Sequence, residues 1–199
     1  MPKGRTRNRR GEGARLREEI LQAARALLEE DGERGVSLRR IARDVGIAAP
    51  SIYAHFPDRD EIVSALVDEA FDELSEAVTA AIDAHVDPAK RLWAACTAYM
   101  EFATLLPNRY DLAFASRDSN ATPRASATRA FMLLVDAVSG CIDAGVSTST
   151  DPFGDATAIW VAMHGYATLR PSRPAFPWPD STATLNRIVS ALASVPAQT

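Results

Sequence analysis

The sequence has little cysteine, few aromatic residues and no long hydrophobic run. Its two cysteines, Cys96 and Cys141, fit neither a metal-ligand spacing nor a disulfide framework, so we expect two buried, reduced thiols. The longest stretch without a charged residue covers the 14 positions 156–169, and a membrane span needs roughly 18. A signal peptide requires an apolar run after its basic start, and no such run follows the basic N-terminus here. We therefore expect a cytoplasmic protein with no membrane-spanning helix.

The sequence also lacks the motifs of common catalytic and cofactor-binding sites. It has no Gly-x-Ser-x-Gly elbow, no Walker loop and no dinucleotide fingerprint. Its three histidines, His55, His85 and His164, are far apart, and none has the partner residues of a zinc-binding helix. We predict that the protein is not an enzyme and that it binds no metal or cofactor.

What the sequence does contain is typical of a helical globular protein. Hydrophobic residues make up 47% and charged residues 24% of the 199 positions. Apolar residues recur at helical spacing, whereas alternating β-strand patterns are nearly absent. Glycine, proline and Asp-Pro pairs separate the helical segments. We predict an all-α fold with helices over 13–30, 37–45, 50–56, 58–84, 87–106, 108–115, 123–144, 151–169 and 180–193. The proline-rich stretch 170–179 is predicted to be a loop.

The charge is distributed unevenly along the chain. Residues 1–60 contain 13 basic and 10 acidic residues, whereas the remainder contains 9 basic and 16 acidic residues. The first 17 residues alone carry a net charge of +6. This pattern fits an N-terminal part that meets a polyanion, with the arm from Lys3 to Arg10 on phosphates or in a minor groove, but it also fits a solvated tail.

The stretch 36–56, VSLRRIARDVGIAAPSIYAHF, has the pattern of a helix-turn-helix. Ala42 is small enough to let two helices approach, and Gly46 tolerates the backbone angles of a tight turn. Ile52 and Phe56, four positions apart, are expected to anchor the second helix on the core. The positions left facing outward are short or polar, as a helix in the major groove requires: Ala49, Ser51, Tyr53, Ala54 and His55.

Over residues 14 to about 66, the sequence resembles the TetR family of bacterial transcriptional repressors. The run Ser-Ile-Tyr-Ala-His-Phe at 51–56 and the run Arg-Asp-Glu-Ile at 59–62 are similar to the recognition helix and the start of the fourth helix in that family. The resemblance implies a disordered basic arm over 1–12, a DNA-binding domain over 13–60, a connecting helix over 61–84 and an effector-binding and dimerisation domain over 85–199.

The resemblance also implies which residues contact DNA. Ser37 and His55 are expected on phosphates, Ser51 and Tyr53 on backbone or base edges, and Arg59 on a phosphate at the start of the fourth helix. Two alternatives stay open: Tyr53 and His55 could complete the local core, and Arg59 could pair with Glu61 or Glu30. The full set of expected DNA-binding residues is Ser37, Arg39, Arg40, Ala49, Pro50, Ser51, Tyr53, His55 and Arg59.

In the second half of the chain, Trp160, His164 and Gly165 resemble the Trp-x-x-x-His-Gly run of the WHG class of TetR C-terminal domains. The resemblance implies a homodimer through the helices near 152–169 and 180–193. Aromatic and apolar residues of this half are candidates for a ligand pocket, although at helical spacing they could equally be plain core. The candidates are Trp93, Phe102, Phe131, Trp160, Met163 and His164.

These observations lead to one functional hypothesis and one alternative. We expect a dimeric repressor that binds a palindromic double-stranded DNA operator and is released by a small, largely hydrophobic effector. The alternative is a helix-turn-helix protein without a small-molecule effector, controlled by a protein partner or acting as an activator.

Overall fold

A computed structural model of the chain describes residues 12–115 and 124–197. The basic arm expected over 1–12 lies outside the described residues, apart from position 12. Every regular element of the described chain is helical, which confirms the predicted fold class. The elements are α1 (Glu12–Asp31), η1 (Glu33–Gly35), α2 (Leu38–Val45), η2 (Ala49–Ala54), α3 (Arg59–Asp83), α4 (Pro88–Leu105), α5 (Pro107–Phe114), α6 (Ala125–Asp143), α7 (Pro152–Ser172) and α8 (Ser181–Leu192).

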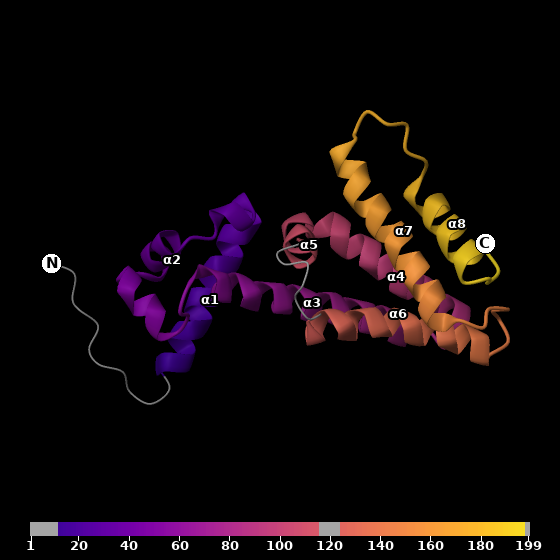
Figure 1. The fold of residues 1–199 in the computed structure, drawn as a ribbon, viewed down its shortest axis with the longest axis horizontal. Helices are drawn as coiled ribbons and strands as arrows, with labels where there is room; N and C mark the ends of the chain where they lie inside the picture. Colours follow the sequence, from indigo (N-terminus) through magenta and orange to yellow (C-terminus); the bar gives the residue numbers. More distant parts are fainter. Residues whose placement is uncertain (1–11, 116–123, 198–199) are drawn as a thin grey trace.

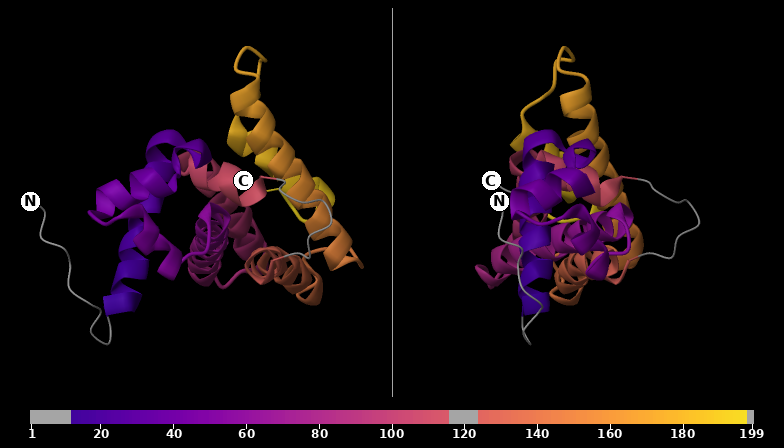
Figure 2. Two further views of the ribbon diagram at one scale, coloured as in Figure 1. Left: turned by 60° about the vertical axis from the view of Figure 1, so that its left-hand side comes forward. Right: turned by 90° about the vertical axis from the view of Figure 1, so that its left-hand side faces the viewer.

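The helices form an N-terminal lobe and a larger C-terminal body that share the long helix α3. Figure 1 shows α1 and α2 at one end of the molecule, with α3 running from this lobe along the length of the body beside α6. Helices α7 and α8 pack together at the far end (Figures 1 and 2). Helix α5 lies between the lobe and the body and contacts α1, α3 and α4.

The helices begin where the sequence places capping side chains. The carboxylate of Asp58 accepts a hydrogen bond of 2.9 Å from the amide of Glu61 at the start of α3. Asp87 and Asp151 cap α4 and α7 in the same way, each before a proline. Gly46 ends α2 in the left-handed conformation, with φ at 74°. These predicted boundaries are therefore confirmed to within a few residues.

Two predicted elements differ from the structure. The segment expected as a helix over 50–56 is a 3-10 helix, Ala49–Ala54, because only two turns fit between the extended Ala48 and the buried Phe56. Helix α7 does not stop at 169 but continues to Ser172. Pro171 is tolerated there because it removes a single hydrogen bond in the last turn, where its fixed φ still suits a helix.

The core runs without a break from the lobe into the body. Ile20, Ile41 and Ile52 are fully buried in the lobe and meet Ile62 from the first turn of α3. In the body, both cysteines are buried as free thiols, as predicted. Burial raises the pKa of Cys96 to about 12 and that of Cys141 to about 11, so both stay protonated at neutral pH.

By length and composition alone, α6 is long and apolar enough to cross a membrane. It nevertheless contains Arg129 and Asp136, and a charged residue within a membrane is costly. Arg129 forms an ion pair of 2.6 Å with Asp72 of α3, and α6 packs against α3, α4 and α7. We therefore interpret α6 as a helix of the bundle.

Candidate functional site

The lobe contains a helix-turn-helix built by α2, the turn at Gly46 and η2. The amide of Ile47 donates to the carbonyl of Ala42 over 2.9 Å, which closes the turn. Ala48 is extended and leads into η2. Ile52 and Phe56 are buried as the spacing predicts, and they fix η2 on the lobe.

Burial of Ile52 and Phe56 leaves the rest of η2 facing outward. Tyr53 is 57% exposed, which is high for an aromatic side chain and removes the alternative that it completes the core. Ser51 and Pro50 are also exposed, whereas Ala49 and His55 are half-buried. The outward face therefore offers hydroxyl groups and small side chains, and it has the composition needed to approach DNA.

The arginines of α2 have unlike surroundings. Arg39 is exposed and, within the described residues, makes no ion pair or side-chain hydrogen bond. Arg40 instead pairs with Asp31 and with Glu30, the latter over 2.9 Å, at the end of α1. The hydrogen bond with Asp31 raises the pKa of Arg40. Arg40 is therefore held by the protein, whereas Arg39 is available to a phosphate.

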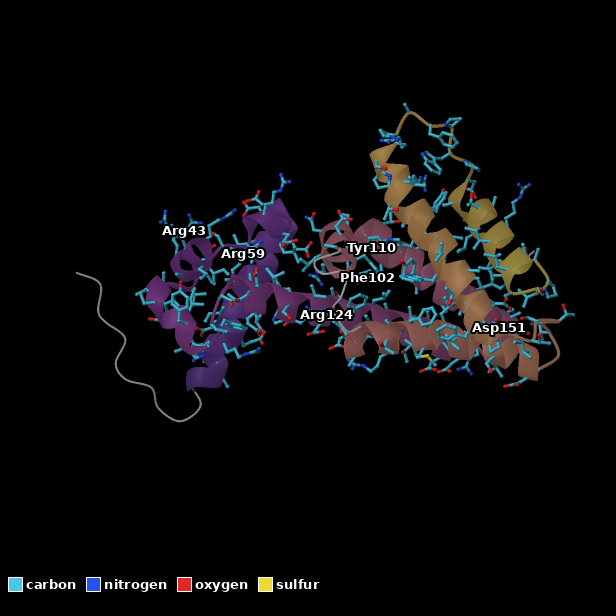
Figure 3. The ribbon with its side chains drawn as sticks, viewed as in Figure 1. Arg43, Arg59, Phe102, Tyr110, Arg124 and Asp151 are labelled. Carbon is cyan, nitrogen blue, oxygen red and sulfur yellow. The ribbon has the colours of Figure 1, made fainter. Side chains whose placement is uncertain are left out.

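Arg59 also binds the protein itself. Its guanidinium donates to the carbonyl of Val36 over 2.7 Å and to the carbonyl of Glu33 over 2.8 Å. Its carboxylate neighbours are Glu33 and Asp60, so the alternative that Arg59 pairs with Glu61 or Glu30 is wrong, whereas its contact with a phosphate stays a prediction. Figure 3 shows Arg59 and Arg43 within the lobe. Through these two hydrogen bonds, Arg59 holds η1 and the segment before α2 against the start of α3.

Ser37 is the residue immediately before α2. Its hydroxyl accepts a hydrogen bond of 3.4 Å from the amide of Arg40, as an N-cap does. The hydroxyl hydrogen stays available to a second acceptor. The start of α2 can thus present a hydroxyl and helix amides together, which is an arrangement that suits a phosphate.

The body contains a second candidate site, an apolar cavity of about 700 Å³. Its walls come from the middle of α3 and from α4, α6 and α7, and the end of α5 closes one side. The lining residues are Phe71, Leu74, Val78, Ala95, Tyr99, Ala113, Phe114, Ala127, Thr128, Ala130, Phe131, Met132, Leu134, Phe153, Trp160 and Met163. A cavity of this size and character suits a small organic ligand.

The structure brings some of the predicted ligand residues to the cavity and places others elsewhere. Phe131, Trp160 and Met163 line it, and the ring of His164 lies 4.9 Å from that of the lining residue Phe114. Trp93 and Phe102 do not line it. Trp93 is buried and lines a separate depression between α3 and α4, and Phe102 is buried in the core, so their role in ligand binding stays a prediction. Helical spacing identifies a buried face without showing which part of it borders a cavity.

Several lining residues were missed in the sequence. Phe71, Leu74 and Val78 belong to the apolar face of α3. Phe153 follows the Asp-Pro pair that begins α7, and it is 58% exposed in the structure. The one available signal was the length of α3, because its apolar stripe continues for several turns beyond what the lobe can bury.

A chain of three polar groups borders the cavity. The hydroxyl of Tyr110 lies 2.6 Å from Nδ1 of His164 and 2.8 Å from the hydroxyl of Tyr99. Burial raises the pKa of Tyr110 to about 12 and raises that of Tyr99 further, and burial lowers the pKa of His164. All three groups are therefore neutral at neutral pH, and Tyr99 is the one that lines the cavity.

Helix α5 connects this region to the lobe. At its start, Asn108 donates to the carbonyl of Glu29 over 2.9 Å, and Arg109 pairs with the carboxylates of Glu29 and Glu73. At its end, Phe114 lines the cavity. Figure 3 shows Tyr110 at this junction of lobe and body. One short helix thus contacts α1, α3 and the cavity.

Comparison with protein families matches both parts of the chain. Residues 20–66 match "Bacterial regulatory proteins, tetR family", and residues 92–192 match "Tetracyclin repressor-like, C-terminal domain". The second match covers just over half of the chain, and its description does not single out the WHG class.

Comparison with individual proteins points the same way. The HTH-type transcriptional regulator Rv1816 of Mycobacterium tuberculosis is 32% identical over 75 residues, which are 38% of this chain and 32% of that protein. This chain therefore matches about a third of the length of that relative. A solved structure of a protein with unknown function from Rhodococcus sp. RHA1 has a TM-score of 0.73 at 26% identity, covering 90% of this chain and 92% of that one. A complex of SmeT with triclosan has a TM-score of 0.64 at 19% identity, covering 89% and 91%.

Proposed function

The chain belongs to the TetR family of DNA-binding transcriptional regulators, a family of proteins that are not enzymes, and from this premise we propose a specific mode of action. The protein acts in the cytoplasm as a dimeric repressor on a palindromic operator, and it leaves the DNA when a small, largely hydrophobic molecule fills the cavity. One observation carries this proposal. Helix α3 has Ile62 and Leu66 in the core of the lobe and Phe71 and Leu74 in or beside the cavity wall.

The DNA side of the proposal rests on the outward face of the helix-turn-helix. Ser51 and Tyr53 present hydroxyl groups to backbone or base edges, and Ser37 and Arg39 present donors to phosphates. Ala49 and Pro50 can contact thymine methyl groups. His55 is half-buried, and we propose that it contacts a phosphate. Arg40 and Arg59 contribute less, because both guanidinium groups are held by the protein.

The release step rests on the two routes between cavity and lobe. A ligand that displaces Phe71 or Leu74 tilts α3. This tilt reaches the lobe because the first turns of α3 lie in the lobe core. A ligand that displaces Phe114 moves α5, whose Asn108 and Arg109 hold the end of α1. Coupling requires only that the ligand binds one of two arrangements more tightly.

The dimer rests on apolar surface at the far end of the body. Leu185, Ile188 and Leu192 form one stripe of α8 and remain only half-buried, and Val161 of α7 is 59% exposed. A second copy would cover this surface and place two helix-turn-helix units on two half-sites about 34 Å or a multiple apart.

Two finer assignments stay predictions. The WHG-type assignment is supported by the run from Trp160 to Gly165 on α7 and by the place of Trp160 in the cavity wall. The alternative function, a regulator without a small-molecule effector that answers to a protein partner or acts as an activator, predicts that the cavity has no ligand. A cavity of about 700 Å³ with apolar walls favours the effector.

Fluorescence anisotropy tests the DNA-binding role. The full chain is titrated onto a duplex from upstream of its own gene and onto a scrambled duplex, over a series of salt concentrations. We expect tight, salt-dependent binding to the first duplex alone. Tyr53→Ala should weaken this binding, and Arg39→Ala should reduce the slope of log K against log salt by about 1.

Arg129→Ala is the matched control for Arg39→Ala, since Arg129 lies on α6 in the body, paired with Asp72. It should leave both the affinity and the salt slope unchanged. Equal, weak binding of the wild-type protein to both duplexes would contradict a specific operator in that region.

A further inference from the structure

Among the residues that the structure describes, none with a charged side chain lines the cavity. Its sixteen lining residues include no Asp, Glu, Lys, Arg or His, and the two with polar hydrogen-bonding oxygens are Thr128 and Tyr99. Thr128 is exposed in the first turn of α6 and donates its hydroxyl hydrogen to the carbonyl of Arg124. A carboxylate or an ammonium group in the cavity would therefore be buried without a counter-ion, which is strongly unfavourable.

The residues behind the wall do not supply a charge either. His164 and Tyr110 are the titratable groups next to Tyr99, and they hydrogen-bond to each other and to it. Burial keeps the imidazole neutral and both phenols protonated at neutral pH. The aromatic rings that gather there, with Phe114 4.7 Å from Tyr110 and 6.1 Å from Tyr99, leave the site apolar.

The indole of Trp160 also hydrogen-bonds to the hydroxyl oxygen of Tyr99 as a donor, but a phenol oxygen has two acceptor positions, so Tyr99 keeps one hydrogen-bonding position for a ligand. If His164 accepts at Nδ1, Tyr110 donates to it and Tyr99 donates to Tyr110, and the oxygen of Tyr99 can still accept. If Nδ1 carries the hydrogen, the order reverses and the hydroxyl of Tyr99 can still donate. A hydroxyl group on a ligand satisfies Tyr99 in both cases, because it donates and accepts.

We propose that the cavity selects an uncharged, mainly apolar molecule whose single polar group is a hydroxyl, and that this hydroxyl hydrogen-bonds to Tyr99. The inference rests on the proposed function only in naming this molecule as the effector. Tyr99 is the specificity-determining residue, and Tyr110 and His164 position its hydroxyl. The apolar remainder of the ligand lies among Phe71, Phe114 and Phe131.

Four probes with one scaffold and different head groups test the proposal. They are 4-hexylphenol, hexylbenzene, 4-hexylbenzoate and 4-hexylphenyl-trimethylammonium. Each is titrated into the full chain at neutral pH without DNA, and Kd is taken from the quenching of tryptophan fluorescence, since Trp160 lines the cavity. We expect 4-hexylphenol to bind about tenfold more tightly than hexylbenzene, and both charged probes to bind more weakly than either.

Tyr99→Phe keeps the ring and removes the hydroxyl. It should abolish the preference for 4-hexylphenol over hexylbenzene while the Kd of hexylbenzene changes less than twofold. Tyr166→Phe is the matched control, because the hydroxyl of Tyr166 donates to the carbonyl of Pro179 away from the cavity. That variant should keep the tenfold preference.

Three binding preferences would overturn the proposal. They are a preference for 4-hexylphenol that survives Tyr99→Phe, tighter binding of the carboxylate, or tighter binding of the trimethylammonium probe, which would mean that the rings bind a cation instead. Absence of binding by all four probes would also overturn it. Because these titrations contain no DNA, their outcome is separate from that of the operator experiment, and each can fail while the other succeeds.

Discussion

Arg39, Arg40 and Arg59 carry the same charge, but Arg40 and Arg59 are held by other residues of the protein, whereas Arg39 stays available for the proposed DNA contact. The sequence predicts a basic helix-turn-helix surface without revealing this division, because the partners of Arg40 and Arg59 come from α1 and η1. Pairing across 9 or more positions depends on how the helices pack. The burial of Ile52 and Phe56 was predictable, since local helical spacing decides it.

Replacing Arg59 by alanine should destabilise the lobe. The change removes the hydrogen bonds to the carbonyls of Val36 and Glu33, and of these two carbonyls that of Glu33 keeps a donor, the amide of Val36. We expect the free energy of unfolding in urea to fall by about 1–2 kcal/mol. Arg43→Ala is the control, because Arg43 is largely exposed and pairs only with the adjacent Asp44 in the described structure. It should change stability by less than about 0.5 kcal/mol, and an equal loss in both variants would contradict the structural role of Arg59.

His164 should make stability depend on pH. Its pKa is lowered in the folded protein by burial, so the unfolded chain binds a proton at a higher pH than the native one does. Stability is therefore full above the unfolded pKa of about 6.5 and is lost as pH falls below it, through the folded pKa. Urea unfolding of the wild type and of His164→Gln between neutral and mildly acidic pH measures this. The variant should lack that part of the decline, and parallel curves would show that His164 does not cause it.

At the scale of elements, the starts and ends of helices were the most predictable features. Ser37, Asp58, Asp87 and Asp151 are local signals, and each caps the helix that follows it. The extension of α7 through Pro171 was not predictable from the same rules, because proline usually ends a helix. The cavity was predictable only in part, since whether Trp93 or Phe131 borders it depends on how four helices pack.

Gly46, in the turn after α2, should be sensitive to substitution. Its φ of 74° is unfavourable for a residue with a side chain, although a Cβ there would contact nothing within 4 Å. Gly46→Ala should therefore lower the free energy of unfolding by about 1–2 kcal/mol through backbone strain alone. Gly140→Ala is the opposite control, because Gly140 lies within α6, also with open space around its Cβ, and it should raise stability by about 0.5–1 kcal/mol. A loss of stability in both would show that strain is not the cause.

At the scale of the whole molecule, the lobe and the body are joined by covalent and non-covalent links. Helix α3 is the covalent link, and Arg109 of α5 is a non-covalent link through Glu29 of α1 and Glu73 of α3. The cap at Asp58 and the apolar spacing after it predicted the long helix over 58–84, and the family resemblance implied that it connects two domains. The link through α5 was not predictable, because Arg109 and Glu29 are 80 positions apart.

Arg109→Ala should reduce the coupling between ligand and DNA. The variant keeps the cavity wall and the DNA-binding face, so each ligand alone should bind with nearly unchanged affinity. The ratio of DNA affinities without and with a bound effector should fall several-fold, within the range of 5- to 150-fold, roughly, that such coupling spans. Anisotropy with and without ligand measures it. Arg129→Ala, which breaks an α3–α6 pair away from α1, should preserve the ratio. An unchanged ratio in Arg109→Ala would show that the ion pairs of Arg109 do not carry the coupling.

The shared helix α3 also constrains how this protein can diverge. Phe71 and Leu74 cannot be replaced by side chains of another shape without disturbing a helix whose first turns lie in the core of the DNA-binding lobe. Met132 and Phe153 face the same cavity from α6 and α7, and both are exposed. A lineage that acquires a new chemical signal while keeping its promoter is therefore expected to accumulate substitutions on the α6 and α7 side, with the α3 side left nearly fixed.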